Sequence, residues 1–515
     1  MFLGLDSSTQ SLKALLIDPD KGEIISSVSV NFTSDFPEFN CPNGVLVNED
    51  PLVNHSDPLL WVAAMDLLFE RLKATGIDLS KVRGISGCGQ QHGSVYVNSR
   101  FEGILASLDG KSVLTDQVKD GLSRLTSPVW LDSSTGSECE YLSDKIGDRL
   151  QTDTGSPAIE RFTGAQINKF YNENKAQYED TAVVHLVSSF LASLLCGENC
   201  PIDFGDGAGM NLLNLKSNSW DQEIADVLAP ELINKLLPAV PSTQVVGKLC
   251  DYFTKYGLAA GVPVVAWTGD NPSSLVGMGA QEPGAVVISL GTSDTFFAAM
   301  KNFTTDPNGC GHVFGNPAGG CMSLICFKNG SLAREKVKDQ YEVDWDFFGG
   351  KALDDTEPGN GFNFMHPYFE SEVTPLVNEA GVKYFGSTEF CSGKASACEY
   401  IRAVVESQFV SMMLHSQWIG ETVNKIRVTG GASSSDGICQ IIADVFQCPV
   451  ERINTTDSAA LGGAMRATQA AGYNLSKVVR KFTEASDVIH PRKEYADVYE
   501  ALLEKYAASE AERLI

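Results

Sequence analysis

The sequence is poor in basic residues. It has 39 Lys and Arg against 65 Asp and Glu in 515 residues, a formal net charge of −26. A surface of this sign repels nucleic acid and anionic membranes, so we expect neither as a partner. The simplest interpretation of the net negative charge is that it keeps the protein soluble. A nucleotide stays compatible with it, because local amides, hydroxyls and Mg²⁺ can bind phosphates.

Cysteine patterns and targeting segments are also missing. The thirteen cysteines include no Cys-x-x-Cys pair and no Cys/His cluster, which indicates a reducing compartment and no structural zinc. The opening MFLGLDSSTQ has no basic region and only a short apolar run, unlike a signal peptide. The longest apolar stretch, residues 183–196, contains His185 and several serines and is too short for a membrane span. We therefore expect a cytoplasmic protein.

The length and ordinary apolar content predict two large domains. A chain of 515 residues exceeds one ordinary core, and 43% hydrophobic with 20% charged residues is a globular composition. Strand-like and helix-like runs mix throughout, so the class is α/β.

The chain opens with a predicted β-hairpin that has an acidic tip. Strand-like runs at residues 2–5 and 12–17 flank a polar turn, and a third strand is expected at 23–32. Within the turn, Asp6 could hold Mg²⁺ through water, while Thr9, the neighbouring serines and the turn amides could bind phosphate oxygens. The alternative is an ordinary Asp-Ser turn, which an isolated case would favour.

A similar hairpin is predicted halfway along the chain, at residues 286–300. Placing Ser8 and Thr9 over Gly291 and Thr292 brings Ser289 opposite Asp6. The repeat suggests two similar domains, each opening with a phosphate-binding hairpin. Because the second copy has no acid at the matching place, a metal role belongs to the first.

A glycine loop follows a predicted strand at residues 426–429. Gly430 and Gly431 precede small polar residues, including Ser434, and a predicted helix at 437–446. Amides at a helix N-terminus suit a nucleotide, although the loop is neither a Walker A loop nor GxGxxG. A tight turn with a serine cap is an equally good interpretation of this stretch alone.

Asp270 and Asn271 end an apolar strand-like run and precede a proline. Strand ends are where α/β proteins place reactive groups, and phosphoryl transfer to a hydroxyl requires a carboxylate that accepts the proton. The alternative is an Asx-Pro turn. His92, in the loop after another predicted strand, and Arg161 are ordinary residues when considered alone.

In chain order, these segments resemble the FGGY family of carbohydrate kinases over nearly the whole sequence. The similar segments are GLDSSTQSLK, SGCGQQHGSVY, ERFTGAQI, SSFLASLL, PIDFGDGAGMNLL, GDNPSSLVGMG, SLGTSDT and TGGASSSDGICQIIADVF. Many members carry Lys-x-x-Trp-Leu after the substrate arginine, where this chain reads NKFYNEN at residues 168–174. This difference from many members reduces the number of family members to which the chain could be assigned.

The resemblance implies an α/β fold of two actin-like, ribonuclease-H-type domains that flank a deep catalytic cleft. Residues 1–280 would hold the sugar site and the first hairpin, and residues 281–515 the nucleotide site and the second hairpin. It also implies ATP and Mg²⁺ as cofactors, Asp270 as the catalytic base and Asp6 near the metal. The implied sugar contacts are His92, Arg161, Asp270 and Asn271, and the implied ATP contacts are Thr9, Thr292, Trp345, Gly430, Gly431 and Ser434.

The activity that the resemblance implies is ATP-dependent phosphorylation of a small open-chain sugar, with D-xylulose expected. Ribulose, gluconate, fuculose and glycerol are the alternatives within the family. A non-catalytic, actin-like ATP-binding module is the remaining alternative, because a fold does not fix a function. Retention of Asp6 and Asp270 argues against it. The oligomeric state stays open between monomer and dimer.

Overall fold

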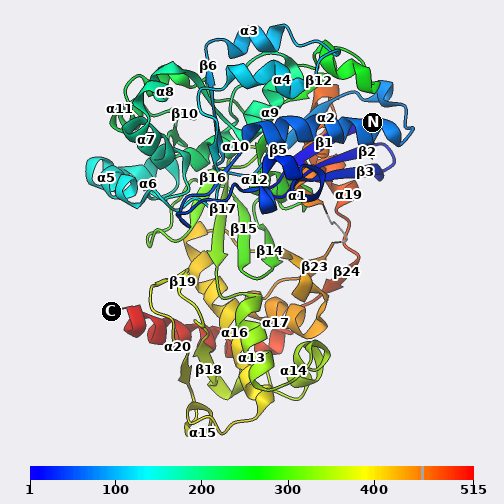
Figure 1. The fold of residues 1–515 in the computed structure, drawn as a ribbon. Coiled ribbons are helices and arrows are strands. Elements are labelled where there is room, and N and C mark those ends of the chain that lie inside the picture. The colour runs from blue at the N-terminus through cyan, green and yellow to red at the C-terminus, as the bar shows by residue number, and fades with distance from the viewer. Residues whose placement is uncertain (454–456, 515) are drawn as a thin grey trace. The chain divides into compact units, whose positions relative to one another are not determined.

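The N-terminal hairpin is the centre of a mixed β-sheet (Figure 1). The computed structural model describes residues 1–453 and 457–514. β1 pairs antiparallel with β2 and parallel with β5. From edge to edge, the strands are β11 (Val245–Lys248), β12 (Pro263–Val265), β5 (Ile85–Gly89), β1 (Phe2–Ser7), β2 (Ser11–Asp18) and β3 (Glu23–Asn31), with β13 (Thr268–Gly269) also beside β5.

A second sheet repeats this arrangement. Its central strand pairs antiparallel with the next strand of its hairpin and parallel with β22, as β1 does with β2 and β5. Ser289 lies beside Thr429 as Asp6 lies beside Cys88, so the internal repeat predicted from the two hairpins is confirmed. Six of its seven strands, in order across the sheet, are β17 (Cys321–Phe327), β15 (Asp294–Met300), β14 (Ala285–Leu290), β22 (Lys425–Gly430), β23 (Val450–Arg452) and β24 (Asp487–Ile489).

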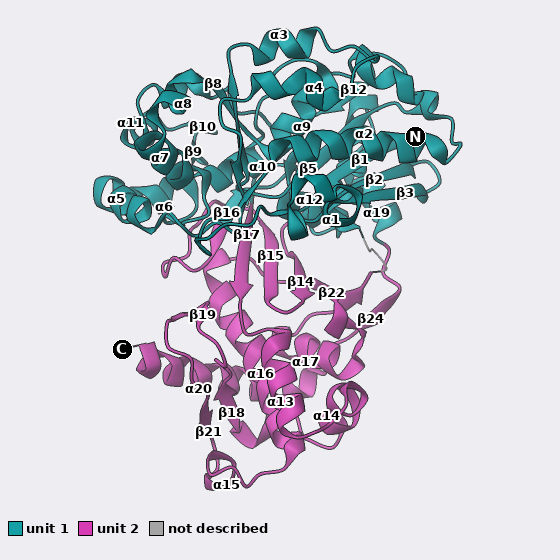
Figure 2. Cartoon of the chain, viewed as in Figure 1, with its two compact units in different colours: residues 1–281, 313–321, 455–483 teal, residues 282–312, 322–454, 484–515 magenta. Residues whose placement is uncertain are grey.

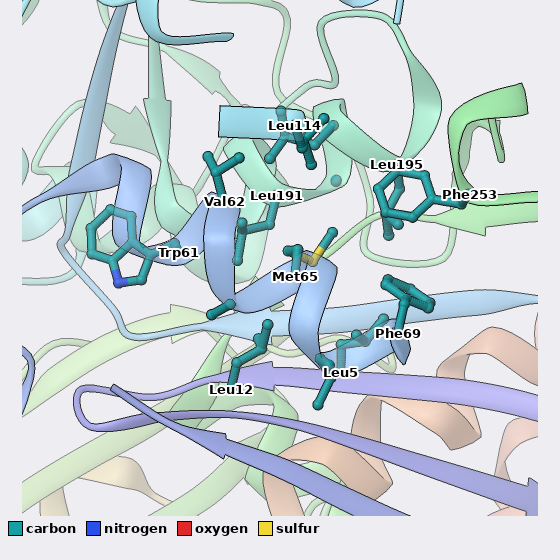
Figure 3. Packing of buried hydrophobic residues seen from close by; sticks show 14 of the residues in the cluster. Leu5, Leu12, Trp61, Val62, Met65, Phe69, Leu114, Leu191, Leu195 and Phe253 are labelled. Carbon is teal, nitrogen blue, oxygen red and sulfur yellow. The ribbon is translucent and has the colours of Figure 1, made fainter. Parts of the chain in front are cut away.

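Helix α2 (Pro58–Ala74) covers one face of the first sheet. Asp57 caps its N-terminus by accepting from the Leu59 amide, and Pro58 supplies a fixed φ in the first turn. Figure 3 shows Leu5 and Leu12 of the strands on one side of the helix and side chains of α9 (Val187–Cys196) on the other. These side chains are fully buried, so this cluster is the main core around the first sheet.

Helices α12 (Asp270–Gly277) and α18 (Ser458–Ala467) pack on the same sheet at unusually short range. A Cβ at Gly4 would lie 2.1 Å from the Ala460 carbonyl oxygen, and one at Gly277 would lie 1.8 Å from that of Ser458. The small residues of α18 therefore allow this close packing, and a side chain at either glycine would force the helix away.

The chain divides into two compact units (Figure 2). Unit 1 contains residues 1–281, 313–321 and 455–483, and unit 2 contains residues 282–312, 322–454 and 484–515. The first division falls one residue after the expected boundary at 280. Two later segments lie with unit 1, among them α18, because its packing on β1 outweighs its late place in the sequence.

The remaining elements surround the two sheets. In unit 1 the other helices are α1 (Phe32–Asp35), α3 (Phe101–Ala106), α4 (Leu114–Val118), α5 (Gly136–Ile146), α6 (Arg149–Thr154), α7 (Thr163–Glu173), α8 (Lys175–Asp180), α10 (Phe204–Gly207), α11 (Gln222–Leu228) and α19 (Leu475–Phe482). In unit 2 they are α13 (Ser331–Gln340), α14 (Ala352–Asp354), α15 (Thr388–Cys391), α16 (Ala397–Ser416), α17 (Asp436–Phe446) and α20 (Ala496–Leu514).

Short strand pairs complete the fold. They are β4 (His55–Ser56) with β7 (Ser127–Pro128), β6 (Ser94–Asn98) with β8 (Thr181–Leu186), β9 (Leu213–Asn214) with β10 (Ser219–Trp220), β18 (Phe364–His366) with β21 (Lys383–Phe385), and β19 (Glu372–Val373) with β20 (Leu376–Val377). Strand β16 (His312–Gly315) begins at the last residue of the unit 2 segment 282–312 and continues into the unit 1 segment 313–321. Within residues 1–453 and 457–514, no helix has the length and apolarity needed to cross a membrane. All thirteen cysteines are free thiols.

Candidate active site

Asp270 lies at the carboxyl edge of the first sheet, as the first residue of α12 directly after β13. Its carboxylate accepts from the backbone N–H groups of Asn271, at 2.9 Å, and of Gln91. Burial raises the pKa of Asp270 to about 6, while these amides act in the opposite direction. A carboxyl group that titrates near neutrality and lies at a strand end has the properties of a general base.

Gln91 joins this group, although the sequence did not single it out. Asn271 donates from Nδ2 to Gln91 Oε1 at 2.8 Å, which directs Gln91 Nε2 elsewhere. That nitrogen is buried and has no hydrogen-bond partner among the described residues. A Cβ at Gly269 would lie 2.4 Å from Gln91 Cγ, so the glycine makes room for this side chain. A buried donor without a partner indicates a place for a ligand atom.

His92 is held as a neutral imidazole. Its ring stacks on Phe162 with centroids 4.4 Å apart, and its Nδ1 lies 2.9 Å from the Gly209 carbonyl oxygen. Because a carbonyl oxygen only accepts, Nδ1 carries the hydrogen and Nε2 is an acceptor. Burial, followed by the charge of Arg161, lowers the pKa of His92 to about 3. The ring can therefore accept a hydrogen bond from a hydroxyl throughout the physiological pH range.

Arg161 lies near this histidine, because both side chains contact the Phe162 ring. Its guanidinium carbon is 5.7 Å from the Phe162 ring centre, and its side chain is partly exposed. The loop after β5 thus connects the predicted sugar residues, because Gln91 contacts Asn271 and Asp270 while the adjacent His92 lies near Arg161.

Asp6 lies in β1 beside Cys88, whose thiol donates to Asp6 Oδ1 at 3.4 Å. Burial and then the charge of Asp270 raise the pKa of Asp6 to about 7. No group of three His, Cys, Asp or Glu within the described ranges could hold a metal by itself. A single carboxylate fits Mg²⁺, which usually binds one or two protein carboxylates together with phosphates and water.

Thr9 lies at the tip of the first hairpin, where Trp130 Nε1 donates to its hydroxyl oxygen at 2.8 Å. The indole itself is 44% exposed. No local sequence pattern indicates this contact, because 121 residues separate the two. It leaves the Thr9 hydroxyl hydrogen available to an acceptor such as a phosphate oxygen.

In unit 2, the glycine loop runs beside the second hairpin. Gly430 has φ 91°, and a Cβ there would lie 2.3 Å from the Leu290 carbonyl oxygen, so only glycine fits. Gly431 and Ser434 bound a short 3₁₀ turn in which the Ser434 hydroxyl donates to the Gly431 carbonyl oxygen at 2.9 Å. Thr292, at the tip of the hairpin, is exposed.

Trp345 belongs to a segment that packs against the same loop. Its ring is 48% exposed and contacts Phe348 edge-on, with centroids 5.4 Å apart. Four residues after Trp345, the Gly349 carbonyl oxygen accepts from the Ser435 hydroxyl at 2.7 Å. Unit 2 therefore brings together the segments that carry all five of its predicted nucleotide residues.

Two family models together match most of this chain. The N-terminal domain of the FGGY family of carbohydrate kinases matches residues 1–277, and its C-terminal domain matches residues 286–471. The chain belongs to the FGGY family of carbohydrate kinases. The resemblance found in the sequence motifs is therefore confirmed.

Curated FGGY relatives are similar over nearly their full length. A xylulose kinase from Rattus norvegicus is 42% identical over 99% of this chain and 96% of its own. Xylulose kinase 2 from Arabidopsis thaliana is 38% identical over 91% of this chain and 86% of its own.

Solved FGGY structures share the fold. A xylulose kinase from Rhodospirillum rubrum superposes with a TM-score of 0.83 at 20% identity, covering 99% of this chain and 98% of that one. A gluconate kinase from Lactobacillus acidophilus gives 0.81 at 21% identity, covering 98% and 96%. At such identities the likeness confirms the α/β architecture of two similar parts.

Proposed function

We propose that this FGGY kinase transfers the γ-phosphoryl group of ATP to D-xylulose and forms D-xylulose 5-phosphate. The observation that carries the proposal is the group at the strand ends, where Asp270 lies with Asn271 and Gln91 beside a neutral His92. The identity with relatives named xylulose kinase supports the choice of sugar. Ribulose, gluconate, fuculose and glycerol are the alternative substrates within the family.

Asp270 would act as the base of the reaction. Its carboxylate accepts the hydrogen bond of the C5 hydroxyl and takes the proton as the oxygen–phosphorus bond forms and the bond from phosphorus to the ADP oxygen breaks. His92 Nε2 accepts from another hydroxyl. Arg161 and Asn271 donate to the remaining sugar oxygens and fix the chain for attack.

The predicted nucleotide contacts of unit 2 would bind ATP. Trp345 offers a ring face for adenine, and Gly430, Gly431 and Ser434 line the nucleotide. Thr9 and Thr292 would donate to phosphate oxygens, and Asp6 would hold Mg²⁺, which would supply positive charge against the charge that develops on the phosphates. We also propose a cytoplasmic location, because all thirteen cysteines are free thiols.

The test is ADP release with Mg-ATP against D-xylulose, L-xylulose, D-ribulose, L-ribulose, gluconate, fuculose and glycerol. We expect kcat/KM for D-xylulose to exceed the next sugar by about tenfold or more, because unpaired polar groups in a site disfavour the wrong hydroxyl pattern. Preference for another sugar would overturn the substrate and keep the reaction class. Folded protein that releases no ADP with any sugar would favour a binding module.

The pH dependence should follow Asp270. Because the base must be ionised and its pKa is about 6, kcat/KM for the sugar should fall about tenfold per unit below pH 6 and level off above it. His92 stays neutral over this range and adds no second limb, and saturating Mg²⁺ keeps Asp6, whose pKa is about 7, in its ionised form. Initial rates from about pH 5 to about pH 8.5 at saturating Mg²⁺ measure the profile. A rate that is flat between pH 5 and 7 would contradict the assignment.

A further inference from the structure

The tip of the second hairpin is tied to the start of helix α13. The Ser331 amide donates to the Gly291 carbonyl oxygen at 2.9 Å, and the Leu332 amide donates to that of Thr292 at 3.3 Å. These are first-turn amides of α13, which have no partner within the helix. Both carbonyls of the tip therefore point toward α13.

A buried ion pair reinforces this connection. Arg334 is fully buried and donates from Nη1 and Nη2 to the two carboxylate oxygens of Asp294, at 2.8 and 2.9 Å. The same nitrogens donate to Gln408 and to the Ser331 hydroxyl, at 2.8 and 2.9 Å. The Asp294 carboxylate also accepts from the Gly291 amide. Asp294 is the first residue of β15, so the two hydrogen bonds from the Arg334 guanidinium hold the hairpin at the residue that follows its tip.

Stability alone does not explain why this ion pair is buried. Two charged groups lose their hydration when they are buried. Apolar residues of similar size often stabilise a core at least as well as such an ion pair does. A planar guanidinium does, however, fix the orientation of the carboxylate that it binds, because both hydrogen bonds must form at once. The arrangement therefore suits a role in which the position of the tip matters.

The fixed carbonyls determine what the tip presents. In a trans peptide the N–H points opposite to the preceding C=O. Because the carbonyls of Gly291 and Thr292 point toward α13, the amides of Thr292 and Ser293 point away from it. The side chains of Thr292 and Ser293 are exposed at the same turn. Two amides and two hydroxyls thus form a set of donors that matches phosphate oxygens.

We propose that the Asp294–Arg334 pair is a positioning device for the ATP phosphates, which holds residues 291–293 with their donors directed at the nucleotide. The proposal rests on the proposed function, since it takes unit 2 to bind ATP. Neither residue touches the phosphates. Both act through Thr292 and Ser293.

The test compares Asp294→Asn with a matched control in the same unit, Asp444→Asn. Asp444 is also fully buried and accepts from Arg492 Nε and Nη2, at 2.9 and 2.7 Å, but it lies in α17, and Arg492 belongs neither to the hairpin nor to α13. Binding of Mg-AMPPNP by calorimetry, both KM values and the melting temperature are measured for each variant and the wild type.

We expect Asp294→Asn to weaken AMPPNP binding and raise KM for ATP by about tenfold, with KM for the sugar within about twofold of wild type, because a small misplacement of binding groups is costly. Asp444→Asn should lower the melting temperature without changing nucleotide affinity. Arg334→Lys, which keeps the charge but loses the planar guanidinium, should lie between wild type and Asp294→Asn. It also provides the test if Asp294→Asn does not fold.

Unchanged AMPPNP affinity in folded Asp294→Asn or Arg334→Lys would overturn the proposal, as would equal losses in the Asp444→Asn control. Because AMPPNP binding needs no sugar, the two proposals can fail separately. A wild type that binds AMPPNP but phosphorylates no sugar would remove the proposed function only.

Discussion

Replacing Asp270 with alanine is expected to lower kcat by about 10²- to 10⁴-fold, the range that a positioned general base contributes. The carboxylate already accepts the amides of Asn271 and Gln91, so it is oriented before the sugar binds. Without it, no group at this strand end takes the hydroxyl proton. KM for the sugar should change much less, because His92, Arg161 and Asn271 remain.

Steady-state kinetics of Asp270→Ala and Asp270→Asn, with circular dichroism to confirm folding, measure this effect. The control is Asp66→Asn. Asp66 lies on α2 in the same unit, and its carboxylate accepts hydrogen bonds from Tyr252 and Tyr256 at 2.7–2.9 Å. That variant should lose stability and keep its kcat. Near-normal turnover in folded Asp270→Ala would show that another group is the base.

Replacing Asp6 with asparagine is expected to lower kcat by about 10²- to 10³-fold, comparable to the loss of one group that stabilises transition-state charge. The raised pKa of Asp6, about 7, means that a proton competes with the metal for this carboxylate. The isosteric amide carries no negative charge. The variant should therefore also need more Mg²⁺ for half-maximal rate.

Rates at fixed ATP over a range of Mg²⁺ concentrations test this second prediction. Asp18→Asn is the matched control, because Asp18 lies at the other end of β2 and accepts from the Asp20 and Lys21 amides of the turn. It should leave the Mg²⁺ dependence unchanged. A normal rate and a normal Mg²⁺ requirement in Asp6→Asn would remove Asp6 from the metal site.

The amino-acid sequence by itself determined the features that neighbouring residues encode. Alternation of apolar residues around polar turns predicted both hairpins, and the shared pattern predicted that the two sheets are copies, as their pairing confirms. Gly430 was recognisable for the same reason, since a strand that ends in glycines before a helix is a local signal. The positions of Asp6, Asp270 and Thr292 followed from these turns and strand ends.

Only the tertiary structure decided which distant residues meet. Gln91 contacts Asn271 across 180 residues, Trp130 contacts Thr9 across 121, and Arg334 reaches Asp294 across 40. The return of α18 to the first sheet belongs with these contacts. Turn chemistry and periodicity depend on adjacent side chains and can be read along the chain, whereas such pairings depend on how whole elements pack, which no local pattern records.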